Sequence, residues 1–174
     1  MTTRQATGRV EVRDTTYLVL ERTFRAPVEA VWAAVTEPER LARWIGTWTG
    51  KPESGEVAFR MLYEGDDVPP EPMRIDACDP PRHLAVTSEM PYDADTPATW
   101  QMMLDLAEVE GVTTLTFTQS LPAPEMAESV GPGWEYYLDR LVVAEDGRDA
   151  ASVVWDDYYP ALGEAYQALV TRAT

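Results

Sequence analysis

The sequence contains few of the residues on which catalytic sites most often depend. Its 174 residues include one cysteine, Cys78, one histidine, His83, and one lysine. A single cysteine forms no intrachain disulfide, and any Ser-His-Asp or Cys-His mechanism would have to use His83 as its base. That histidine stands at the expected start of a strand, and the chain has no G-x-S-x-G motif. We therefore assign no catalytic residue and expect Cys78 to be a small buried thiol.

Signatures of metal and nucleotide sites are also missing. The chain has no H-E-x-x-H motif and no pair of cysteines, and the acidic pairs at 66–67 and 156–157 lack the spacing of an EF-hand loop. The segment Gly131-Pro132-Gly133 matches neither a P-loop nor a dinucleotide-binding fingerprint. The sequence thus predicts no metal and no cofactor.

Long apolar runs and positive charges are scarce. No apolar run approaches the ~20 residues that a membrane-spanning helix needs, and residues 1–14 lack the apolar core of a signal peptide. We therefore expect a cytoplasmic protein without membrane insertion. Acidic residues number 30 against 14 basic ones, which gives a formal net charge of -16. Because this charge repels polyanions, nucleic acid is not an expected partner.

The most informative stretch that is present covers residues 23–46, TFRAPVEAVWAAVTEPERLARWIG. Pro27 keeps the preceding residue extended and suits the first position of a helix. The apolar residues that follow recur at i, i+3, i+4 and i+7, which predicts one buried helical face: Val28, Val31, Trp32 and Val35. Thr36 and Glu39 have the spacing of a capping box, so we expect a second helix that ends at Gly46 in a left-handed C-cap.

Most of the remaining chain predicts strands, followed by one long helix. The apolar spacing becomes helical from residue 133, with Gly147 as the C-cap, and a last amphipathic segment begins near residues 158–160. Because 45% of the residues are hydrophobic, the chain can bury one core. A curved antiparallel sheet that wraps one long C-terminal helix, an α+β fold, satisfies this order. Alternating apolar residues and β-forming residues indicate strands over residues 17–24, 56–63, 73–77, 83–89, 98–108 and 112–119.

The same patterns divide the chain into three segments. Residues 1–14 are polar and weakly patterned, so we expect a flexible or edge segment there. Residues 15–147 should form the domain itself. Residues 148–174 should be a C-terminal extension whose short helix packs on the same domain.

Residues 23–46 resemble a motif of the START-related or SRPBCC superfamily, in its branch named after the activator of heat-shock-protein-90 ATPase. The similarity lies in the alanine-proline start, the valine-tryptophan helix and the pattern T-x-P-E-x-L-x-x-W. The segment GWEYYLDRL, residues 133–141, is similar to the start of the family's long C-terminal helix. This resemblance covers roughly residues 16–147 and implies a helix-grip (START/Bet v 1-like) fold. It also implies a cavity between sheet and long helix, which relatives use for lipids, polyketides, plant hormones or aromatic metabolites.

Large apolar side chains fall on the faces that should converge on such a cavity, although an ordinary solid core would use the same residues. Which polar groups point inward depends on strand register, because a slip of one residue exchanges the two faces. The apolar candidates are Phe59, Met61, Trp100, Met102, Phe117, Trp134, Tyr137, Leu138 and Leu141, and the candidate polar groups that would orient a ligand are Arg74, Gln101 and Gln119.

Three functions remain open from the sequence. The first is a soluble protein that binds a small hydrophobic or aromatic molecule in the cavity. The second is an enzyme of the cyclase, aromatase or hydrolase kind that acts on such a molecule by positioning and general acid/base help. The third is a co-chaperone-like or homodimeric interaction module that uses exposed aromatic residues, for which the candidates are Trp48, Trp155, Tyr158 and Tyr159.

Overall fold

The computed structural model describes residues 4–174. Within them, eight strands form one sheet in the spatial order β1-β2-β8-β7-β6-β5-β4-β3, and neighbouring strands are antiparallel. The strands are β1 (Arg9–Val12), β2 (Thr16–Phe24), β3 (Gly46–Thr49), β4 (Glu56–Met61), β5 (Glu71–Asp79), β6 (His83–Glu89), β7 (Thr99–Val109) and β8 (Val112–Leu121). Expectations for residues 1–3 lie outside the described residues.

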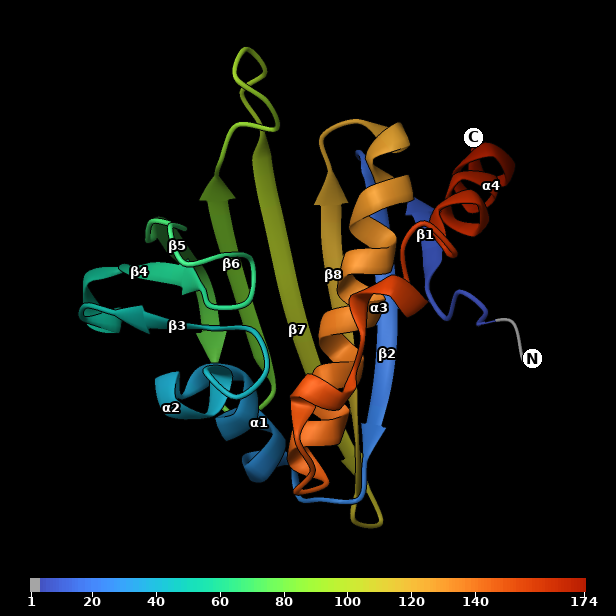
Figure 1. Cartoon of the computed structure of the whole chain (residues 1–174). Helices are drawn as coiled ribbons and strands as arrows, with labels where there is room; N and C mark the ends of the chain where they lie inside the picture. The colour runs from blue at the N-terminus through green and yellow to red at the C-terminus, as the bar shows by residue number, and fades with distance from the viewer. Residues whose placement is uncertain (1–3) are drawn as a thin grey trace.

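The α-helices of this part of the chain are α1 (Val28–Thr36), α2 (Pro38–Leu41), α3 (Ala127–Glu145) and α4 (Gly163–Ala173). The longest, α3, runs along one face of the sheet in front of β8 and β2, while α1 and α2 lie together at one end and α4 lies beside β1 (Figure 1). None of the helices within residues 4–174 is long and apolar enough to cross a membrane. The predicted helix-grip architecture is confirmed.

The core lies where α3 packs on β2 and β8. Leu18 and Leu20 of β2 and Leu115 of β8 are at most 1% exposed, and Leu138 and Leu141 of α3 are equally buried. Full burial of one such side chain contributes about 1.5–3 kcal/mol. This strip of leucines therefore sets the position of α3 over one half of the sheet.

The connection between β2 and β3 differs from the expectation in its helix boundaries. Pro27 is extended and precedes α1, so the helix begins one residue later than expected. Thr36 ends α1, and its hydroxyl donates to the carbonyl oxygen of Trp32 at 2.7 Å, so the predicted capping box is wrong. The one-turn helix α2 begins at Pro38, and no side chain caps its N-terminus. Proline supplies the start there, because its missing N–H needs no cap.

Gly46 is not the left-handed C-cap that we expected. It begins β3 and pairs with Met61 of β4. A Cβ atom at this position would overlap the carbonyl oxygen of Arg60 and the ring of Phe59. The glycine is therefore required by the close approach of two strands rather than by backbone conformation.

The long helix begins six residues before the expected position, at Ala127. Its first two turns contain Gly131, where a Cβ atom would overlap the ring of Tyr166 from α4. Gly131 is thus required by the close packing of α4, although glycine inside a helix is otherwise unfavourable. After the helix, Gly147 has a φ of +77°, as the C-cap prediction requires.

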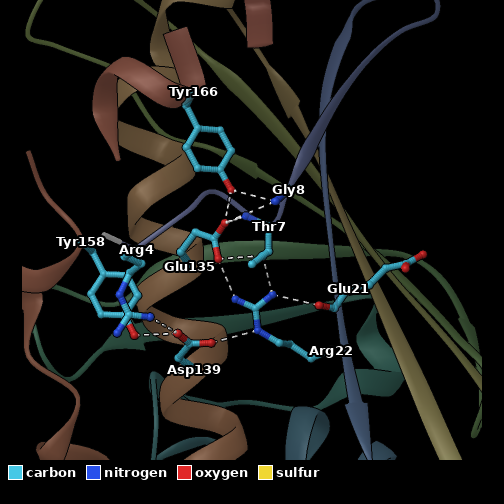
Figure 2. Close-up of polar contacts among 9 residues, drawn as sticks. All are labelled: Arg4, Thr7, Gly8, Glu21, Arg22, Glu135, Asp139, Tyr158 and Tyr166. Atoms are coloured by element: carbon cyan, nitrogen blue, oxygen red, sulfur yellow. Dashed lines mark hydrogen bonds and ion pairs between the residues drawn. The ribbon is translucent and has the colours of Figure 1, made fainter. Parts of the chain in front are cut away.

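A buried polar cluster joins both ends of the chain to α3 and β2 (Figure 2). Glu135 lies at its centre and is only 2% exposed. It accepts hydrogen bonds from the backbone N–H and hydroxyl of Thr7 at 2.5 and 2.8 Å and from the N–H of Gly8 at 3.3 Å. It also accepts from the Tyr166 hydroxyl at 2.5 Å and from Arg22 at 2.8 Å. One carboxylate therefore holds the N-terminal segment, β2 and α4 together.

Asp139, one turn further along α3, extends the cluster. It accepts from Nε of Arg22 at 3.0 Å, from the Tyr158 hydroxyl at 2.6 Å and from Arg4 at 3.1 Å. Both carboxylates thus bind the same guanidinium, and each also binds a tyrosine of the C-terminal segment (Figure 2). Residues 148–174 are in this way attached along the outer face of α3.

The titration of Glu135 follows from these contacts. Burial by itself would raise its pKa, but the hydrogen bonds from Tyr166, Thr7 and Arg22 outweigh burial and hold the pKa below its ordinary value of 4.5. Burial and the charge of Glu135 together raise the pKa of the Tyr166 phenol, which stays protonated. Since the folded carboxyl binds its proton less readily than the unfolded one, its stabilisation is present above about pH 4.5 and is lost as the pH falls through the folded pKa.

We expect the substitution Glu135→Gln to lower the free energy of unfolding at pH 7 by about 3 kcal/mol, because loss of one member of a buried ion pair leaves the other undercompensated. The difference from the wild type should narrow as the pH falls below the ordinary value of 4.5. Urea unfolding followed by tryptophan fluorescence at several pH values measures both effects. Glu11→Gln is the control, since Glu11 pairs with Arg9 and Arg13 at the surface and should cost at most about 1 kcal/mol. Equal losses for the two variants would contradict the prediction.

Candidate functional site

A cavity of about 1020 Å³ lies between the sheet and α3. Its walls come from strands β3 to β8, from all three of α1, α2 and α3, and from the segments that connect β4 to β5 and α3 to α4. Most of the lining side chains are aliphatic or aromatic. The cavity is therefore of the concave, mostly apolar kind that binds small molecules in other proteins.

Strand alternation explains which residues reach the cavity. Alternate residues of each strand line it, as the two-residue period of a strand requires. In β5 the register shifts between Ile75 and Ala77, and beyond this bulge Cys78 lines the cavity in place of its neighbours. Strand residues of the lining include Val57, Phe59 and Met61 of β4, Leu84, Val86 and Ser88 of β6, Trp100, Met102 and Leu104 of β7, and Leu115, Phe117 and Gln119 of β8.

The structure brings together almost all of the apolar candidates. The exception is Leu141, which is fully buried in the core between α3 and the sheet. The stripe of apolar residues on α3 is wider than the face that borders the cavity, so its C-terminal part packs on the sheet directly. The candidates that line the cavity are Phe59, Met61, Trp100, Met102, Phe117, Trp134, Tyr137 and Leu138.

The polar candidates are divided between the two faces of the sheet. Gln119 lines the cavity, but Arg74 and Gln101 are exposed and are not among the lining residues. Arg74 instead donates to Asp76 at 2.8 Å. Both residues alternate with lining neighbours, so the two-residue period directs their side chains outward, and their assignment to the cavity is wrong.

Trp134 is the most firmly held wall residue. Its indole N–H donates to Oε1 of Gln119 at 2.6 Å, and its ring centroid lies 4.0 Å from that of Phe117. A contact between α3 and β8 thus fixes the ring. The Trp134 ring therefore borders the cavity but cannot turn into it.

Sequence patterns did not assign the end wall of the cavity, which is formed by Trp32, Trp44 and Trp48. The indole N–H of Trp44 donates to the carbonyl oxygen of Ala34 at 3.0 Å, and that of Trp48 donates to Thr36 at 2.8 Å. These bonds fasten the helix pair and β3 to one another. The same rings also face the cavity, which only the tertiary structure reveals.

The segment between β4 and β5 supplies a second unpredicted wall. The Tyr137 hydroxyl donates to Oε1 of Glu64 at 3.0 Å, and burial followed by the charge of Glu64 raises the pKa of Tyr137 well above its ordinary value. The adjacent Tyr63 ring lies 4.0 Å from the guanidinium of Arg140, a cation–π contact. This segment is therefore held to α3 at two points.

The aromatic residues proposed for an interface have three different environments. Trp155 lines the cavity, contacts Tyr136 edge to face at 5.4 Å between centroids and stacks on Tyr159 at 5.7 Å. Tyr158 is buried and bonded to Asp139. Trp48 is half-buried in the end wall. Packing within the chain thus accounts for most of their surface, with Trp155 and Tyr159 still partly exposed.

The single histidine lies away from the cavity, and the single cysteine, which lines it, is not buried. His83 lies 2.6 Å from Asp105, and neither residue lines the cavity. Cys78 is exposed, so the expectation of a buried thiol is wrong. Over residues 4–174, no group of three or more His, Cys, Asp or Glu side chains is arranged to hold a metal ion.

The family model described as Activator of Hsp90 ATPase homolog 1-like protein matches residues 25–144, more than half of the chain. Among solved structures, CalU16 from Micromonospora echinospora has a TM-score of 0.74 at 26% sequence identity, with 94% of this chain and 96% of that chain covered. A conserved protein of unknown function from Enterococcus faecalis has a TM-score of 0.70 at 19% identity, with coverages of 96% and 92%.

DynU16, described as a putative protein in the dynemicin biosynthetic locus, has a TM-score of 0.62 at 24% identity, with 77% of this chain and 49% of that chain covered. No curated protein matches this sequence significantly. The family match spans α1, the strands from β3 to β8 and nearly all of α3, which together enclose the cavity. The chain belongs to the family of activator of Hsp90 ATPase homolog 1-like proteins, as the resemblance of residues 23–46 predicted.

Proposed function

We propose that this protein binds a small hydrophobic or aromatic molecule in the cavity between the sheet and α3. The observation that carries the proposal is the cavity itself, whose volume of about 1020 Å³ suits a ligand of several fused rings. A solid core would have filled this space with side chains at crystal-like density. Binding of an apolar ligand of matching shape is favourable in such a cavity, because the ligand replaces water or empty space with apolar contacts.

The character of the walls favours flat rings. Phe117 and Trp134 form one fixed aromatic surface, and Tyr136 and Trp155 form another at the C-terminal extension. Aromatic pairs add about 0.5–1.5 kcal/mol beyond the area that they bury. Offset stacking on these rings would therefore orient an aromatic ligand as well as bind it.

The similar structures supply a biological context. DynU16 is described as a putative protein of the dynemicin biosynthetic locus. A biosynthetic locus makes small molecules, so this context favours a metabolite as the ligand class. By analogy, a metabolite rather than a macromolecule is the first ligand to seek for this chain.

A cyclase-like or aromatase-like enzyme is the second candidate, and one observation favours it. Tyr137 and Glu64 form a hydrogen-bonded acid/base pair on the cavity wall. The raised pKa of Tyr137 keeps its hydroxyl protonated, and the hydroxyl would donate to a ligand carbonyl in place of Glu64. Binding is placed first because the lining, within the described chain, includes neither histidine nor lysine. Incubation of an extracted ligand with fresh protein, followed by mass analysis, distinguishes a carrier from an enzyme.

Native mass spectrometry of the protein purified from its own host should show a bound small molecule that solvent extraction removes. Gly133 offers a way to block the site, because it lines the cavity and a Cβ atom there meets nothing within 4 Å. We expect Gly133→Phe to fold, to place its ring in the cavity and to lose the bound mass. A wild-type protein that is empty in every preparation would overturn the proposed function.

Gly133→Ala is the matched control for this position. It should keep the ligand and raise the free energy of unfolding by up to about 1 kcal/mol, because alanine replaces glycine inside a helix. Urea denaturation of the two variants beside the wild type measures this effect. A loss of stability in the alanine variant would show that the space beside Gly133 is occupied.

A further inference from the structure

We propose that the cavity selects aromatic ligands that carry an amine over those that carry a carboxylate, and that Glu71 is the residue that pairs with the ammonium group. This inference rests on the proposed ligand-binding function and names the chemical class of the ligand. Three features support it: the charges on the wall, the Glu71 carboxylate, which has no partner within residues 4–174, and two polar side chains that face the cavity.

The charges on the wall have one sign. Among the described residues that line the cavity, Glu64 and Glu71 are acidic, and neither lysine, arginine nor histidine is present. A carboxylate ligand would therefore enter without a counter-ion and lose its hydration, which is costly in an apolar site. A cationic ligand would be favoured there and would also be attracted at long range by the net charge of -16.

Glu71 is the carboxylate without a partner. It begins β5, lies opposite Phe59 of β4 and is half-buried. Within residues 4–174 its side chain has neither an ion pair nor a hydrogen bond, and burial raises its pKa, as expected for a carboxyl that lacks a compensating charge. Glu64, by contrast, already accepts the hydrogen bond of Tyr137. A ligand ammonium would give Glu71 the charged partner that the chain itself does not supply.

The buried arginine beside the cavity does not reverse this preference. Arg140 donates through Nε to the carbonyl oxygen of Trp44 at 2.9 Å and through a terminal nitrogen to that of Ala150 at 3.0 Å. Its guanidinium lies over Tyr63, and it is not among the lining residues. The Tyr63 ring would thus separate an anion in the cavity from the guanidinium, so the anion could form no ion pair with it and would gain only the weaker attraction at a distance.

Two polar side chains also face the cavity, Ser88 on β6 next to β5 and Gln119 on β8, three strands from β5. Ser88 is 6% exposed and Gln119 is 4% exposed, and both line the cavity. Gln119 accepts from Trp134 through its oxygen, while its amide NH2 and the Ser88 hydroxyl have no hydrogen-bond partner in the described chain. Neither polar atom is fully buried, because within residues 4–174 only Arg40 Nε is a buried side-chain nitrogen or oxygen without a partner. Both atoms are therefore able to bond a ligand that enters the cavity.

The register places these groups on one face. Ser88 pairs with Met73, and Glu71 lies two residues from Met73 along β5, so Glu71 and Ser88 are diagonal neighbours. Trp100 pairs with Ser88 from the other side, and its indole N–H is bonded to the carbonyl oxygen of Met90 at 2.9 Å. An ammonium held by Glu71 would therefore have a hydroxyl and an aromatic ring close by, the surroundings in which cation–π contacts add to binding.

The test uses three probes with one ring system: 1-pyrenemethanol, 1-pyrenemethylamine and 1-pyrenecarboxylic acid, titrated at pH 7 and followed by fluorescence. The alcohol reports whether the cavity binds an aromatic molecule at all. We expect the amine to bind at least about tenfold more tightly than the acid, because one charge-assisted hydrogen bond is gained and one uncompensated charge is avoided.

The variant Glu71→Gln measures how much the Glu71 charge contributes to binding of the amine. It should weaken binding of the amine by about 10- to 100-fold, since hydrogen bonds to charged groups are the strong ones, and leave the alcohol within about threefold. The control is Glu56→Gln, which removes the same charge from an exposed residue of β4 that does not line the cavity. This variant should bind all three probes as the wild type does. An unchanged affinity for the alcohol shows that Glu71→Gln has kept the cavity intact.

The outcomes separate the two proposals. If the wild type does not bind the alcohol, both the ligand-binding function and the amine preference are overturned. If the alcohol binds but the amine and the acid bind alike, the preference alone is overturned. The same holds if Glu71→Gln and Glu56→Gln weaken the amine equally, because the preference then reflects only the overall charge. A loss of amine affinity confined to Glu71→Gln supports the inference.

Discussion

One helix cannot cover this sheet, and the cavity follows from that constraint. Eight strands spaced by about 4.8 Å span roughly 34 Å, whereas a helix with its side chains is about 10 Å wide. The leucine strip and the Glu135–Arg22–Asp139 cluster hold α3 over β2 and β8. The concave face of the strands from β4 to β7 is left without a helix on it. The sheet curls and α1, α2 and the connecting segments close the edges, so a cavity of about 1020 Å³ remains between them.

A cavity of this size persists only if its walls do not collapse into it, and the tryptophans show how collapse is avoided. Four of the six tryptophans that line the cavity donate their indole N–H to an acceptor in the surrounding structure, so these four rings cannot rotate inward without breaking a hydrogen bond. The anchors come from different elements, which makes the wall rigid as a whole. The pairs are Trp44 with Ala34, Trp48 with Thr36, Trp100 with Met90, and Trp134 with Gln119.

Much of this arrangement could be predicted from the sequence, because strand alternation and helical spacing are local properties. Alternation placed Phe59 and Trp100 on the concave face, and the same rule, applied consistently, places Gln101 on the other face. Helical spacing could not separate Leu141 from Leu138, since both lie on the apolar stripe and only the position of α3 on the sheet divides core from cavity. The walls from residues 62–70 and from Trp155 depend on tertiary contacts, which leave no periodic signal in the sequence.

The fold and the ligand are separate questions in this protein. The mismatch between one helix and a wide sheet produces a cavity in any chain with this architecture, so family membership explains the space but not its occupant. The occupant is set by the few polar groups on the wall. Here those groups are two carboxylates, one amide and several hydroxyls, while the buried Arg140 nearby is bonded to backbone carbonyls behind Tyr63. Within residues 4–174 the wall has no positive charge and Glu71 has no counter-ion, which is the arrangement on which the proposed preference for a cation rests.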